Sequence, residues 1–194
     1  MKNIKIIGVL LVAVLVGSTL TGCLGNNKNK ISAGDNKSSA AEEIKMESDI
    51  KVMNTGKKAI DFELKDLQGK SHKLSDYAGK KVYIKYWASW CSICLAGLNE
   101  INTLSSGNSD FEVITIVSPG FRGEKKSEDF KKWFSGLEYK NITVLLDEEG
   151  TISNKYEVRG YPTSSFIGSD GILVKTLPGH KSNEDIIAEF KNVK

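Results

Sequence analysis

Two different hydrophobic patterns lie along the chain, and a polar segment separates them. The first is an apolar stretch over residues 6–16, which follows Lys2 and Lys5. A positive start and an apolar stretch of this length predict a secretory signal peptide over residues 1–22, because a membrane-spanning helix needs about 20 apolar residues. The second pattern begins near residue 55, where apolar residues recur at strand or helix intervals. It predicts one folded domain over residues 56–194.

Within this domain the two periodicities alternate. Strand-like segments lie at 59–64, 71–74, 81–87, 111–117, 142–146, 164–168 and 172–177. Helical segments lie at 92–104, 127–137, 151–156 and 182–192, with serine caps expected at Ser127 and Ser182. This order predicts an α/β fold in which helices flank a mixed central sheet, with an amino-terminal β-hairpin extension.

Composition and charge narrow the functional classes. Hydrophobic residues make up 40% and charged residues 26% of the 194 positions, as in globular proteins. The net charge of +3 is small and no basic stripe is interleaved with aromatic residues, so we expect no nucleic-acid partner. Residues 23–55 are mostly small and polar, which predicts a flexible tether, because such a segment cannot bury enough apolar surface to fold.

The chain has three cysteines, and two of them, Cys91 and Cys94, are separated by only two residues. They lie where a predicted strand ends and a predicted helix begins. Helix dipole and free amide groups stabilise a thiolate at this position, so Cys91 is expected to be the more exposed, attacking sulfur. Cys94, one turn along the helix, is expected to be the buried sulfur that resolves a mixed disulfide. The pair therefore predicts thiol–disulfide exchange.

Other chemistries of a cysteine pair are less favoured by the sequence. A structural zinc site needs four ligands, yet the chain has no second cysteine pair, and its histidines, His72 and His180, are isolated. A haem attachment site would need histidine after Cys94, where Leu95 stands. A purely structural disulfide is a further alternative. We expect no metal and no other cofactor.

The third cysteine ends the segment Leu20-Thr21-Gly22-Cys23. This segment resembles the lipobox of bacterial lipoproteins, which implies that Cys23 is acylated, for example with palmitate, and becomes the mature amino terminus. The resemblance implies an extracytoplasmic protein anchored to the bacterial cell membrane by lipid. The alternative is an uncleaved anchor with an incidental cysteine.

The stretch from Tyr86 to Cys94 (YWASWCSIC) resembles the active-site segment of thioredoxin-fold proteins, above all the membrane-tethered TlpA/ResA group. Gly160-Tyr161-Pro162-Thr163 resembles the family's loop with a cis-proline. The resemblance implies that Pro162 packs beside the cysteines and that Tyr161 offers backbone hydrogen bonds to a substrate. The alternative for Pro162 is an ordinary edge-strand proline. Trp90 is a candidate for partner docking.

A narrower resemblance covers almost the whole domain. Residues 84–91, 117–121, 124–126 and 130–133 are similar to the amino-terminal domain of PilB-type methionine sulfoxide reductases. It implies that the chain passes electrons to an extracytoplasmic methionine sulfoxide reductase and is recharged by a CcdA/DsbD-type membrane protein. A disulfide-forming oxidase and an apo-cytochrome-binding or partner-binding adaptor are the alternatives. The loop over residues 121–126 either contacts a partner or is a solvated basic loop.

Two positions depart from the family pattern. Thioredoxins have an aspartate where this chain has Lys85, and many TlpA/ResA proteins have a glutamate where it has Gly97. On one continuous helix, Glu100 lies about 240° around from Cys94 and cannot simply replace that glutamate. Lys85 either lies buried near Cys94, where its charge would favour the thiolate, or reaches solvent past the sheet edge.

Overall fold

The computed structural model describes residues 53–107 and 110–194. The predicted signal peptide, the predicted acylation of Cys23 and nearly all of the predicted tether lie outside these residues. Among the helices that the structure describes, none has the length and apolar character needed to cross a membrane.

The described domain is built on one eight-stranded sheet with the order β1-β8-β7-β4-β5-β6-β2-β3. The central strand β4 runs parallel to β5 and antiparallel to β7, so the predicted mixed sheet is confirmed. The strands are β1 (Lys57–Lys58), β2 (Glu63–Asp66), β3 (Ser71–Lys73), β4 (Lys81–Tyr86), β5 (Phe111–Val117), β6 (Val144–Leu146), β7 (Thr163–Ile167) and β8 (Ile172–Pro178).

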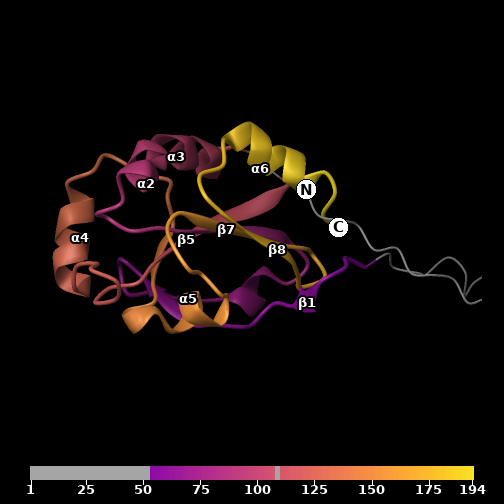
Figure 1. Cartoon of the computed structure of the whole chain (residues 1–194), viewed down its shortest axis with the longest axis horizontal. Coiled ribbons are helices and arrows are strands. Elements are labelled where there is room, and N and C mark those ends of the chain that lie inside the picture. Colours follow the sequence, from indigo (N-terminus) through magenta and orange to yellow (C-terminus); the bar gives the residue numbers. More distant parts are fainter. Residues whose placement is uncertain (1–52, 108–109) are drawn as a thin grey trace, which may run out of the picture. The chain divides into compact units, whose positions relative to one another are not determined.

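Helices cover both faces of this sheet, with α2, α3 and α6 on one side and α5 on the other (Figure 1). The helices are α2 (Ser92–Ala96), α3 (Leu98–Ser106), α4 (Ser127–Ser135), α5 (Thr151–Lys155) and α6 (Asn183–Phe190), with short 3-10 turns η2 (Leu74–Tyr77) and η3 (Glu148–Gly150). Because successive side chains of a strand point to opposite faces, β4 contributes to two cores. Tyr83 and Trp87 pack with α3, α4 and α6, whereas Ile84 and Tyr86 pack with residues of α5.

Two of the predicted elements differ from the structure. The strand expected at 59–64 begins only at Glu63, because side chains hold the backbone before it: Asp61 accepts hydrogen bonds from two backbone amides and Tyr156 donates to the carbonyl of Ile60. β2 then pairs antiparallel with β3. The single helix expected at 92–104 is divided at Gly97, which ends α2 and precedes α3.

The expected serine caps have different outcomes. Ser182 caps α6, because its hydroxyl accepts a hydrogen bond from the backbone amide of Asp185 at 3.2 Å. Ser127 is instead the first residue inside α4, its hydroxyl donates to Glu148, and Lys126 occupies the cap position without a side-chain bond. The prediction of a cap at Ser127 is therefore wrong by one position.

Phe130 of α4 tests how much the aromatic cluster over β4 contributes to stability. It is fully buried, and its ring centroid lies 5.8 Å from that of Trp87 and 5.6 Å from that of Trp133. We expect Phe130→Ala to lower the free energy of unfolding by about 3–5 kcal/mol in urea titrations, because it leaves a cavity in the core. Ile187→Ala on α6, where the side chain is exposed, is the control and should change it by less than about 1 kcal/mol. Equal effects of the two variants would contradict this account of the core.

Candidate active site

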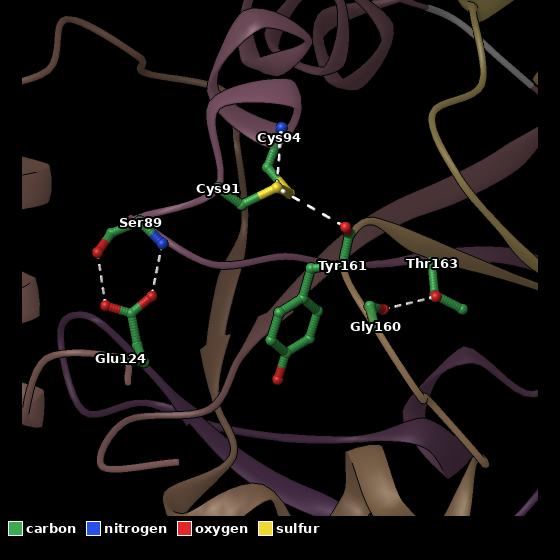
Figure 2. Close-up of a disulfide and its surroundings, with 7 residues drawn as sticks. All are labelled: Ser89, Cys91, Cys94, Glu124, Gly160, Tyr161 and Thr163. Atoms are coloured by element: carbon green, nitrogen blue, oxygen red, sulfur yellow. Dashed lines mark hydrogen bonds between the residues drawn. A yellow bond between two sulfur atoms is a disulfide. The ribbon is translucent and has the colours of Figure 1, made fainter. Parts of the chain in front are cut away.

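The cysteine pair lies at the amino-terminal end of α2, just past the end of β4. Cys91 is the cap residue of this helix, with an extended backbone, and its sulfur accepts a hydrogen bond from the amide of Cys94 at 3.3 Å. The two residues form a disulfide with their Cα atoms 5.2 Å apart (Figure 2). After reduction, the same amide would point at the Cys91 sulfur and favour its thiolate form.

The two sulfurs differ in exposure as the sequence predicts. Cys91 is 7% exposed, whereas Cys94 is completely buried. The side chains next to them point outward: Trp90 is 53% and Ile93 60% exposed. On α2 it is Cys94, not Ile93, that points inward. An apolar rim of Trp90 and Ile93 therefore borders the disulfide, and Ile93 is a candidate contact residue that sequence reasoning missed.

The loop before β7 reaches the disulfide from the other side. The Tyr161–Pro162 peptide is cis, as the sequence predicts, and the carbonyl oxygen of Tyr161 lies 3.8 Å from the Cys91 sulfur (Figure 2). The neighbouring carbonyls have other partners: that of Gly160 accepts from the Thr163 hydroxyl, and that of Pro162 accepts from the amide of Gly179, both at 2.8 Å. The Tyr161 carbonyl thus faces the reactive position.

The structure brings together five of the six residues that the sequence singled out for the site or the anchor. Trp90 makes an edge-to-face contact with Tyr161, with ring centroids 6.0 Å apart, beside Cys91, Cys94 and the buried Pro162. Burial raises the pKa of the Tyr161 phenol, so this ring is neutral at physiological pH. The sixth residue, Cys23, lies outside the described residues.

Sequence reasoning missed a buried carboxylate that supports the segment before Cys91. Glu124 is 7% exposed, and its carboxylate accepts hydrogen bonds from the backbone amide and the hydroxyl of Ser89, the latter at 2.6 Å (Figure 2). Lys125 adds a bond to the same hydroxyl at 2.9 Å. This part of the 121–126 loop is therefore anchored to the site rather than freely solvated. No local signal marks the pair, because 35 residues separate its members.

Lys85 proves to be buried, with 2% of its surface exposed, so the alternative in which it reaches solvent is wrong. Burial lowers the pKa of this lysine to about 8, although the nearby negative charge of Glu100 opposes the shift. A Cβ atom on Gly97 would lie 3.2 Å from the Lys85 Nζ and 2.8 Å from a ring carbon of His180. Gly97 therefore leaves room for these two side chains.

The histidines have carboxylate neighbours. His72 lies 2.8 Å from Asp66, and His180 lies 3.3 Å from Glu100, measured between nitrogen and oxygen. The side chain of His72 is only 16% exposed. Within the residues that the structure describes, no three His, Cys, Asp or Glu side chains gather as a candidate metal site.

Comparisons with known proteins agree with this geometry. Residues 55–176 match the model of the AhpC/TSA family. The chain is 29% identical over 143 residues to the thiol-disulfide oxidoreductase ResA of Geobacillus thermodenitrificans, which is 72% of this chain and 78% of that protein.

Two solved structures are also similar. The exposed lipoprotein thioredoxin Etrx1 of Streptococcus pneumoniae is 49% identical, with a TM-score of 0.67 over 69% of this chain and 100% of that one. The N-terminal domain of PilB from Neisseria gonorrhoeae is 33% identical, with a TM-score of 0.62 over 66% of this chain and 87% of that one. The chain therefore belongs to the AhpC/TSA family, has its thioredoxin-like fold, and is a thiol-disulfide oxidoreductase.

Proposed function

We propose that this oxidoreductase is tethered outside the cytoplasm by a lipid on Cys23 and reduces client proteins through Cys91 and Cys94. The observation that carries the proposal is the placement of the cysteine pair. The Cys91 sulfur lies at a helix amino terminus, 3.8 Å from the Tyr161 carbonyl, and Trp90 is exposed beside it. A reactive sulfur next to backbone groups and an apolar rim suits an extended segment of another protein better than a small molecule.

The reaction then proceeds by two exchanges. The Cys91 thiolate attacks a client disulfide, so that one client sulfur leaves as a thiolate and the other is bound to Cys91. The Cys94 thiolate next attacks the Cys91 sulfur, which forms the Cys91–Cys94 disulfide and releases the second client sulfur. Two electrons pass from this chain to the client, and the released thiolates take up protons from water.

The surroundings of Cys91 suit a protein client. The Tyr161 carbonyl can accept a backbone hydrogen bond from an extended segment, as a strand edge does. Trp90 and Ile93 offer apolar contact beside it, and aromatic side chains are common at the centre of protein interfaces. We therefore assign substrate binding to Trp90, Tyr161 and Pro162, and attack and resolution to Cys91 and Cys94 in that order.

A methionine sulfoxide reductase is the favoured client. Support comes from the 33% identity to the PilB N-terminal domain, since the resemblance to PilB-type proteins implies electron transfer to sulfoxide reductase domains. The 49% identity to an exposed lipoprotein thioredoxin supports a free-standing, lipid-anchored form. A CcdA/DsbD-type membrane protein would then return the oxidised chain to its dithiol form.

The reduction potential separates a reductant from a disulfide-forming oxidase. We expect the Cys91–Cys94 couple, equilibrated with glutathione buffers, to have a midpoint of about −200 mV or lower, as reductants of this fold do. Alkylation of the free thiols followed by mass spectrometry measures the oxidised fraction. A midpoint near roughly −120 mV would indicate the oxidase instead.

Trapping in the native host identifies the client. Cys94→Ser leaves Cys91 able to attack but removes the sulfur that resolves the mixed disulfide. We expect this variant to accumulate a disulfide-linked complex with a methionine sulfoxide reductase, visible on non-reducing gels and identified by mass spectrometry. Cys91→Ser is the matched control and should accumulate none. If Cys94→Ser traps no protein at all, the chain acts as a partner-binding adaptor rather than a reductant.

The mature amino terminus tests the anchor. We expect protein from the membrane fraction to begin at Cys23 and to carry the mass of at least two acyl chains, because one chain gives only marginal membrane binding. Mass spectrometry of the amino-terminal peptide measures this, and Cys91→Ser should retain the same modification. Membrane-bound protein with an intact Gly22–Cys23 bond would mean an uncleaved anchor.

A further inference from the structure

One charged side chain lies inside the sheet on the same face as the cysteines. Lys85 is in the middle of β4, where it is paired with Thr115 of β5 and Ser164 of β7. Side chains of a strand alternate between faces, so Lys85 points to the same side as Tyr83 and Trp87. These two residues belong to the buried cluster that also contains Cys94. Lys85 therefore points into the same layer of packing that contains Cys94.

The ammonium group of Lys85 lies beside Gly97. The Lys85 Nζ lies 3.2 Å from the point that a Cβ atom on Gly97 would occupy. Gly97 ends α2 and donates a backbone hydrogen bond to the carbonyl of Cys94 at 3.2 Å. The ammonium group thus lies at the carboxyl-terminal end of the single short helix that carries both cysteines, where the free carbonyls of a helix favour positive charge.

The titratable groups around Lys85 come from each element packed against it. They are Glu100 of α3, His180 between β8 and α6, and Tyr83 on β4 itself, whose hydroxyl is bonded to Ser164 at 2.8 Å. Cys94 of α2 lies in the cluster on the face to which Lys85 points. Glu100 is the anion in this set, and one of its oxygens is buried 3.3 Å from the His180 ring nitrogen.

Glu100 is the neighbour that favours the charged form of Lys85. Burial lowers the pKa of Lys85 to about 8, and Glu100 opposes the shift. The ammonium form therefore predominates at pH 7.

We propose that Lys85 is a positioning residue that acts through Cys94, with its ammonium group stabilising the Cys94 thiolate in the reduced protein. The inference rests on the proposed function, in which this thiolate attacks the mixed disulfide. In that step the proton of Cys94 goes to water, the Cys91–Cys94 bond forms, and the client sulfur leaves as a thiolate. An opposite charge within a few ångströms favours ionisation of a thiol, and burial makes the effect larger.

The test measures Cys94 without any client. In the full chain with Cys91→Ser, the pH at which the rate of iodoacetamide alkylation of Cys94 is half its maximum reports the pKa of this thiol even though the sulfur is buried, and peptide mass spectrometry identifies the modified residue. We expect Lys85→Met in this background to slow alkylation at pH 7 by about tenfold and to move the whole rate profile to higher pH. Lys85→Arg, which keeps the positive charge, should restore most of the rate.

Lys81→Met is the matched control. Lys81 is on the same face of β4, four residues earlier and about 13 Å away along the strand. This variant should change the rate by less than twofold. If Lys85→Met folds, as judged by circular dichroism, and also changes the rate by less than twofold, the inference is wrong.

A second variant replaces Lys85→Met if that protein does not fold. Should Lys85→Met not fold, Lys85→Gln, which keeps a polar side chain of similar length, makes the same comparison with the same expected loss. The result is independent of client trapping by Cys94→Ser. Loss of trapping with a normal Lys85 effect would reject the proposed function alone, whereas normal trapping without a Lys85 effect would reject this inference alone.

Discussion

The pairing of β4 on both of its edges determines where every group of the site lies. Its parallel partner β5 and antiparallel partner β7 bury five of its six residues, so neither edge is free. The β7 register begins with Thr163 opposite Tyr86, which brings Pro162 and Tyr161 to the end of β4 from which the chain continues to Cys91. A slip of one residue would send every β4 side chain to the opposite face.

The same register places a lysine where an apolar side chain would be expected. A buried cation is costly unless other groups compensate it, and proteins keep such groups mainly where function requires them. Here Glu100 supplies the opposite charge, and Gly97 lacks the side chain that would exclude Lys85 and His180. Gly97 therefore has two effects: it separates α2 from α3, and it leaves space for Lys85 beside the site.

The site separates the reacting atoms from the surface that a client would meet. Cys94 is buried in the core, and the buried Glu124 carboxylate supports the segment before Cys91 through its hydrogen bonds to Ser89. Trp90 and Ile93 are exposed around it. Members of the family share the fold that buries Cys94 and carry out thiol–disulfide exchange. The identity of the client depends on the exposed residues, which are few.

The elements with local signals could be predicted from the amino acids alone. Residues 111–117 form the predicted strand, the strands predicted at 164–168 and 172–177 correspond to β7 and β8, and Cys91 lies at a helix start. Each depends on side chains close together in the chain. Two contacts became visible only in the folded chain: Glu124 supports Ser89, and Lys85 is buried beside Gly97. These contacts join residues that are 35 and 12 positions apart, and no local pattern records which distant side chain will fill a given space.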